Sequence, residues 1–108
     1  MKIVNNPIDM AIEVMEENYP KVASRIKTIE FAYITKQFSA TVFDGDDIYI
    51  FLNATMEQGR DLTIERAALL LVHEFAHAVA GNHAHGQLWE NVVERLLYLI
   101  HEKKEKER

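Results

Sequence analysis

The stretch from residue 64 to residue 80 constrains the fold most, because its apolar residues recur with the period of an α-helix. This apolar face consists of Ile64, Ala68, Leu71, Val72, Phe75 and Val79. A helix with such a face is stable when the face packs against another layer of the protein. We expect Asp61 or Thr63 to cap the helix and Gly81 to end it, since glycine commonly occurs just past a helix end.

The N-terminal segment predicts another amphipathic helix. Asn6 can cap it and Pro7 suits its first turn, and apolar residues then follow at helical spacing. The helix should end at Tyr19, because Pro20 disfavours helical geometry in the residue before it. Residues 21–25 could add one further turn.

Alternation of apolar and polar residues predicts three strands. They span Lys27 to Tyr33, Ser39 to Phe43 and Ile48 to Leu52. In the first strand Ile29, Phe31 and Tyr33 face the same side. The turn Asp44-Gly45-Asp46-Asp47 should join the second and third strands as a hairpin, and a polar connection from Asn53 to Arg60 leads on from the third.

A last helix is predicted from about Gly86 to past His101. Its apolar stripe consists of Trp89, Val92, Val93, Leu96, Leu99 and Ile100. The order of helix, three strands and two helices is typical of the α+β class. Because 108 residues is close to the commonest domain size, we expect residues 1–108 to form a single domain.

Composition excludes several classes of protein. The chain has no cysteine, which excludes disulfide scaffolds, zinc-finger sites and iron–sulfur sites. No apolar run is long enough to cross a membrane, and the N-terminus lacks the apolar region of a signal peptide. A cytoplasmic protein without a membrane partner is therefore expected. A net charge of −5 argues against nonspecific nucleic-acid binding, and nothing in the sequence indicates an oligomeric state.

The predicted helix, which begins after Asp61 or Thr63 and runs to about Ala80, contains the string His73-Glu74-Phe75-Ala76-His77. Residues four apart lie on one face of a helix, so His73 and His77 can both bind one metal ion. Zinc accepts neutral imidazole nitrogens at about 2.0–2.1 Å. Glu74 points to the side, where it can reach a water on the ion without binding the metal. The string matches the zincin signature, in which the glutamate is the general base.

A catalytic zinc has three protein ligands and one open position for water. The candidates for the third ligand are His83, His85, Glu90 and Glu94. The loop over residues 81–86 should reverse the chain, so that the last helix returns antiparallel beside the histidines. His85 would then lie at the start of that helix near His77, Glu90 about one turn into it, and Glu94 a turn deeper.

The sequence resembles the SprT-like metallopeptidases over Leu71 to Trp89. Their pattern is H-E-x-x-H, a short loop and then H-G-x-x-W or H-G-x-x-F, and here His85-Gly86-Gln87-Leu88-Trp89 follows the first motif. The resemblance implies that His73, His77 and His85 bind zinc. It also implies that Glu74 is the base and that Trp89 packs behind the site. The chain departs from typical members in its shorter length and in having no zinc ribbon after the catalytic part.

The chain also resembles minimal gluzincin zymogens of similar length. In gluzincins a glutamate on the second helix is the third ligand, often within E-x-x-x-D, and Glu90-Asn91-Val92-Val93-Glu94 is similar. That resemblance implies that Glu90 binds the metal and that Glu94 supports a ligand histidine. It further implies that a C-terminal segment, here His101 and the tail after it, can block the cleft. We favour His85 over Glu90, because histidine plus glycine at a helix start is the more unusual feature.

These residues predict a zinc metallopeptidase, active or latent, that hydrolyses peptide bonds with Glu74 as general base. Its substrate would be a peptide or protein in extended conformation, paired through main-chain hydrogen bonds with the open edge of the strand from Asp47 to Asn53. The alternative is a latent or inactive zinc-stabilised binding or regulatory module, in which His85 and Glu90 both bind the metal and close the site.

Overall fold

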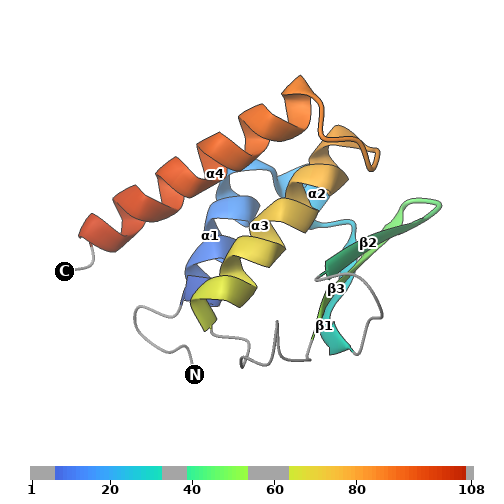
Figure 1. The fold of residues 1–108 in the computed structure, drawn as a ribbon, viewed down its shortest axis with the longest axis horizontal. Helices are drawn as coiled ribbons and strands as arrows, with labels where there is room; N and C mark the ends of the chain where they lie inside the picture. The colour runs from blue at the N-terminus through green and yellow to red at the C-terminus, as the bar shows by residue number, and fades with distance from the viewer. Residues whose placement is uncertain (1–6, 33–38, 54–63, 107–108) are drawn as a thin grey trace.

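The computed structural model describes residues 7–32, 39–53 and 64–106. In these residues four helices and a three-stranded mixed sheet form the α+β fold expected from the sequence (Figure 1). The elements are α1 (Pro7–Asn18), α2 (Pro20–Ala23), β1 (Ile26–Ala32), β2 (Ser39–Asp44), β3 (Asp47–Asn53), α3 (Ile64–Ala80) and α4 (Gln87–Lys106). Each predicted element is present, with small differences at its ends.

β2 and β3 form the predicted hairpin. They pair antiparallel from Asp44 opposite Asp47 to Ser39 opposite Leu52. Gly45, in the turn between them, has a φ of 61°. Glycine adopts this left-handed conformation without the steric penalty that a Cβ atom brings, which is why a glycine here favours a tight hairpin.

The sheet has the order β1-β3-β2, with β1 parallel to β3. β3 is therefore the central strand, and the prediction that residues 47–53 form an open edge is wrong. Alternate side chains of β3, namely Ile48, Ile50 and Leu52, are fully buried, and a central position lets such an apolar strand pack along its whole length. Among the described strands, β2 is instead the edge strand that contacts α3.

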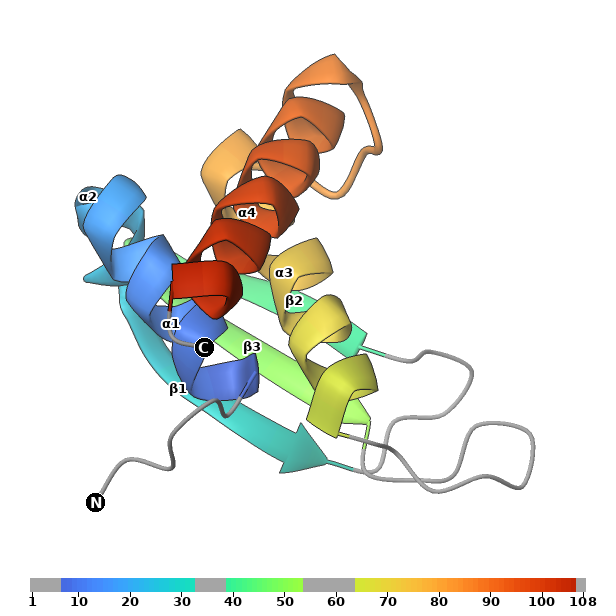
Figure 2. The same ribbon diagram turned by 90° about the vertical axis from the view of Figure 1, so that its left-hand side faces the viewer.

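The core lies between the sheet and the helices, and α3 is at its centre. α3 contacts β2 and β3 on one side and α1 and α4 on the other (Figures 1 and 2). Phe75 of α3 is fully buried and meets the ring of Tyr19 edge-on, with ring centroids 5.9 Å apart. The predicted apolar stripe of α4 packs against the same core, with Val92 and Leu96 buried. Packing on both sides fixes the rotation of α3 about its axis.

Some predicted details differ or fall outside the described residues. Phe31 is 57% exposed, although alternation placed it with Ile29, which packs against the core. The core cluster thus reaches only the first part of β1. Several predicted features fall outside the described residues. They are the capping residues Asn6, Asp61 and Thr63, the strand residue Tyr33 and residues 54–60 of the polar connection.

In the described ranges, every helix is too short or too polar to cross a lipid bilayer.

Two leucines of α4 test which face of this helix is docked. Leu96 is completely buried, whereas Leu88 is 55% exposed. We expect Leu96→Ala to lower the free energy of unfolding by about 2–5 kcal/mol, because it removes buried methyl groups and leaves a cavity. Leu88→Ala should change it by at most about 0.5 kcal/mol. Urea unfolding followed by circular dichroism measures both, and equal losses would contradict the packing of α4.

Candidate metal centre

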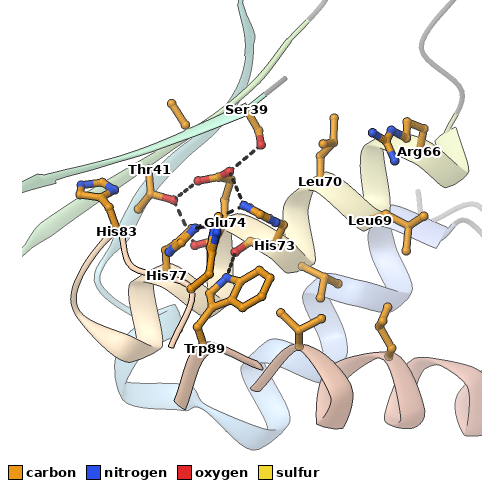
Figure 3. A pocket seen from close by; sticks show the side chains of 15 residues that line it. Ser39, Thr41, Arg66, Leu69, Leu70, His73, Glu74, His77, His83 and Trp89 are labelled. Carbon is orange, nitrogen blue, oxygen red and sulfur yellow. Dashed lines mark hydrogen bonds and ion pairs between the residues drawn. The ribbon is translucent and has the colours of Figure 1, made fainter. Parts of the chain in front are cut away.

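The helical turn between His73 and His77 brings their rings together on one side of α3. The ring centroids are 4.9 Å apart and the two Nε2 atoms 3.3 Å apart. This is the geometry that the four-residue spacing predicts. Figure 3 shows both rings beside Glu74, over the start of α4.

The loop between α3 and α4 brings His85 to the same place. Gly81, with a φ of 77°, ends α3, and the Asn82 side chain accepts a hydrogen bond from the backbone N–H of Ala84 at 2.9 Å. This tight reversal leaves His85 Nε2 only 3.2 Å from His77 Nε2. The three histidines thus form a group whose ligand atoms all lie within 4.8 Å of one another.

Two of the nitrogen–nitrogen distances in this group fit a tetrahedral metal ion. Two ligands at about 2.0–2.1 Å from a tetrahedral zinc are about 3.3 Å apart. The two closest pairs of the group, at 3.3 Å and 3.2 Å, match this edge length. A set of three neutral imidazoles without cysteine is typical of catalytic zinc, which leaves a fourth position for water.

A hydrogen bond to the loop sets the orientation of the central histidine. His77 Nδ1 lies 3.1 Å from the backbone carbonyl oxygen of Asn82. A carbonyl only accepts, so Nδ1 carries the hydrogen and the lone pair of Nε2 points toward the other two rings. Metal-binding histidines commonly make such a bond through the nitrogen that does not bind the metal.

Trp89 packs behind the three histidines. Its ring centroid is 4.4 Å from that of His85, 5.0 Å from that of His73 and 5.6 Å from that of His77. Its indole N–H donates to the backbone carbonyl of His73 at 3.2 Å. Trp89 therefore packs against all three rings, and it links the start of α4 to α3.

Glu74 is buried next to the histidine group but is not a member of it. Its side chain points to β2, where Ser39 Oγ lies 2.5 Å from Oε2 and Thr41 Oγ1 lies 2.6 Å from Oε1. Oε2 is also 3.7 Å from His73 Nε2. The carboxylate is thus close to the nitrogen group without being a member of it.

The two hydroxyl partners of Glu74 were not predicted from the sequence. Ser39 and Thr41 are two residues apart on a strand and therefore point to the same face of the sheet. This alternation was a usable signal, but it gives no indication of which helix the strand packs against.

The other candidate ligands lie outside the histidine group. Glu90 and Glu94 are exposed and are not part of the group of His73, His77 and His85. His83 packs edge-on against Phe43, with centroids 5.3 Å apart, and its ring centroid is 6.1 Å from that of His77, so it lines the cleft beside the group without being a member of it.

The described part of the C-terminal tail lies away from the histidines. His101 is exposed, and residues 101–106 continue α4 alongside α1 (Figure 2). Lys103 Nζ is 3.2 Å from Glu13 Oε2 and 3.3 Å from Glu17 Oε1, both on α1. Up to residue 106, the tail therefore leaves the histidine group uncovered.

A cleft of about 670 Å³ opens in front of the histidines. The edge strand β2 forms one wall, through Ser39, Ala40 and Thr41. Apolar side chains of α3 and α4, including Leu69, Val93 and Leu97, form the other. The histidine group is therefore accessible from a cleft that is large enough to hold more than a water molecule.

Burial lowers the pKa of both histidines on α3. For His73 the loss of hydration dominates, the nearby Glu74 carboxylate opposes it, and His85 adds to it. For His77 burial again dominates, with Glu74 opposing and His73 adding to the effect. Both rings are therefore neutral at pH 7, which is the form that binds a metal ion.

The chain matches no known protein family, no curated protein and no solved structure.

The ligand set predicts how zinc binding responds to single substitutions. The wild-type chain should bind one zinc ion. His85→Ala should weaken binding by more than about 100-fold, because the loss of even a supporting group costs about 10–100-fold. Glu90→Ala and the neighbouring loop variant His83→Ala should change the affinity by less than about twofold, since neither side chain is a member of the ligand group. Competition titration against a zinc-binding dye measures all three, and a larger loss for Glu90→Ala would overturn this ligand set.

The lowered pKa values predict that the metal-free protein loses stability in mild acid. The unfolded chain, with histidine pKa values of about 6.5, binds more protons than the folded chain once the pH falls below that value. The free energy of unfolding should therefore decrease as the pH falls below about 6.5. The double variant His73→Gln/His77→Gln should show a smaller decrease in urea unfolding with a chelator present. An identical pH dependence in both proteins would contradict this.

Proposed function

We propose that this chain is a small zinc-dependent metallopeptidase of the zincin type. The observation that carries the proposal is the joint placement of a three-histidine group and the Glu74 carboxylate in one cleft. Three imidazole ligands and a neighbouring acid that does not bind the metal are the parts that metal-assisted hydrolysis requires. The resemblance to SprT-like metallopeptidases points to the same ligands and the same base.

The residues divide the chemistry between them. His73, His77 and His85 would hold a zinc ion, which when bound lowers the pKa of a water molecule to about 7 and polarises a carbonyl group. Glu74 would take a proton from the attacking water and deliver it to the leaving amine. Trp89, packed against all three rings, would exclude solvent from the rear of the site.

The substrate would lie extended along β2. This strand is an edge strand of the described sheet and forms one wall of the cleft. An added strand gains main-chain hydrogen bonds that do not depend on its sequence, and the side chains decide specificity. The edge position of β2 thus supports an extended-peptide substrate, although the sequence predicted that this substrate would pair with residues 47–53.

The rival function is a zinc-stabilised binding or regulatory module. It would need four protein ligands around the metal. Glu90 is exposed and lies outside the ligand group, so the three-ligand set with a free position favours the enzyme.

The decisive substitution is Glu74→Gln, which keeps the shape of the side chain and removes its basicity. Cleavage of fluorescein-labelled casein by the zinc-loaded protein should fall by about 10²–10⁴-fold, the usual contribution of a general base. The zinc content should stay at one per chain. Glu90→Gln, the same change at an exposed position of α4, is the matched control and should retain full activity.

Two results would count against the enzyme. Undiminished cleavage by Glu74→Gln would remove Glu74 as the base. A wild-type chain that binds one zinc ion and cleaves neither casein nor a peptide library would favour the binding module instead.

A further inference from the structure

The carboxylate of Glu74 is held at both oxygens by hydroxyl groups of one strand. Oε2 pairs with Ser39 Oγ at 2.5 Å and Oε1 pairs with Thr41 Oγ1 at 2.6 Å. Figure 3 shows the carboxylate between the two hydroxyls and the histidine rings. We propose that Ser39 and Thr41 are positioning residues that aim the Glu74 carboxylate at the reacting water; this inference rests on the proposed function.

A glutamate needs such support because its side chain has several rotatable bonds. The backbone of α3 fixes the Cα atom of Glu74, but not the direction of its carboxylate. Two bonds to different oxygens fix both the position and the plane of the group. Hydrogen bonds to a charged acceptor are roughly twice as strong as neutral ones, so this pair of contacts can hold one rotamer.

Thr41 also fixes the distance between the strand and the helix. Its single hydroxyl hydrogen is shared between two acceptors, Glu74 Oε1 at 2.6 Å and the backbone carbonyl oxygen of Glu74 at 3.0 Å. The side chain of Thr41 is buried, so water cannot replace it easily. The position of the base therefore depends on how β2 docks against α3.

The two hydroxyl contacts leave acceptor sites of the carboxylate unused. An ionised carboxylate offers about four acceptor sites, and the two hydroxyls use one on each oxygen. Oε2 is 3.7 Å from His73 Nε2, so a remaining lone pair is available on the histidine side. The two hydroxyl groups thus orient the carboxylate and leave acceptor sites on it unused.

The same strand forms the wall of the cleft along which we propose that the substrate lies. A peptide paired with β2 and the Glu74 carboxylate held by β2 would both be fixed to the same strand. A shift of about 1 Å between reacting groups can lower a rate by about 100-fold. Fixing both partners to one strand keeps their separation constant while the substrate binds.

A purely structural role would have different consequences. If the hydroxyls served only to satisfy a buried carboxylate, their loss would destabilise the protein and leave kcat of the folded molecules unchanged. If they position the base, kcat falls while KM and zinc content stay the same, because the interaction matters only when the proton is transferred.

The test uses the zinc-loaded chain of residues 1–108 with fluorescein-labelled casein as substrate. Thr41→Val removes one hydroxyl and keeps the shape of the side chain, and Thr41→Ser restores the hydroxyl. Ser39→Ala tests the second hydroxyl at a less buried position and serves if Thr41→Val does not fold. Ser24→Ala, whose hydroxyl contacts only the backbone of Lys21 among the described hydrogen bonds, is the matched control.

We expect Thr41→Val and Ser39→Ala each to lower kcat by about 10–100-fold, with KM and zinc stoichiometry within about twofold of the wild type. Thr41→Ser should recover most of the activity, and Ser24→Ala should match the wild type. Unchanged kcat in both Thr41→Val and Ser39→Ala, or no recovery in Thr41→Ser, would overturn the inference.

A second readout does not depend on activity. Three-bond couplings of the Glu74 side chain, measured by nuclear magnetic resonance, should report one rotamer in the wild type and averaged rotamers in the Thr41→Val/Ser39→Ala double variant. A single rotamer in both proteins would overturn the positioning role even if the wild type cleaved nothing. Absence of cleavage with zinc bound would count against the proposed function alone.

Discussion

The packing of α3 on two sides is the constraint on which the rest of the structure depends. Its apolar residues meet the sheet on one side and α1 and α4 on the other, so the helix cannot rotate about its axis. Because of this, His73 and His77 point into the cleft rather than into the core. The face of α3 that packs in the core thus determines which side chains its opposite face presents to the cleft.

The contacts around the histidines add to this constraint from three other elements. The loop after Gly81 orients His77 through the carbonyl of Asn82, the first turn of α4 contributes Trp89, and β2 contributes the hydroxyls that hold Glu74. A candidate metal site assembled in this way depends on the tertiary fold. It is therefore sensitive to changes that do not touch the histidines.

Local signals in the sequence were enough to predict the helices, the strands and the pairing of His73 with His77. Helical periodicity located α3 and α4, the Asp-Gly turn identified the hairpin, and the four-residue spacing paired His73 with His77. These features depend on neighbours within one turn or one hairpin, where residue type and geometry are tightly linked.

Long-range relations could not be predicted in the same way. The parallel pairing that makes β3 central joins segments that no turn connects directly, so no local signal revealed it. The contact of Thr41 with Glu74 spans 33 positions. The choice between His85 and Glu90 depended on the path of the loop over residues 81–86, which residue types alone left open.

The most direct test of this account is a crystal structure of the zinc-loaded chain, with the metal located by anomalous scattering at the zinc absorption edge. The account predicts one zinc ion bound by Nε2 of His73, His77 and His85 at about 2.0–2.1 Å, a water molecule as fourth ligand, and Glu74 beside that water. An ion bound by Glu74 or Glu90, or rings of His73 and His77 that do not share one ion, would contradict it.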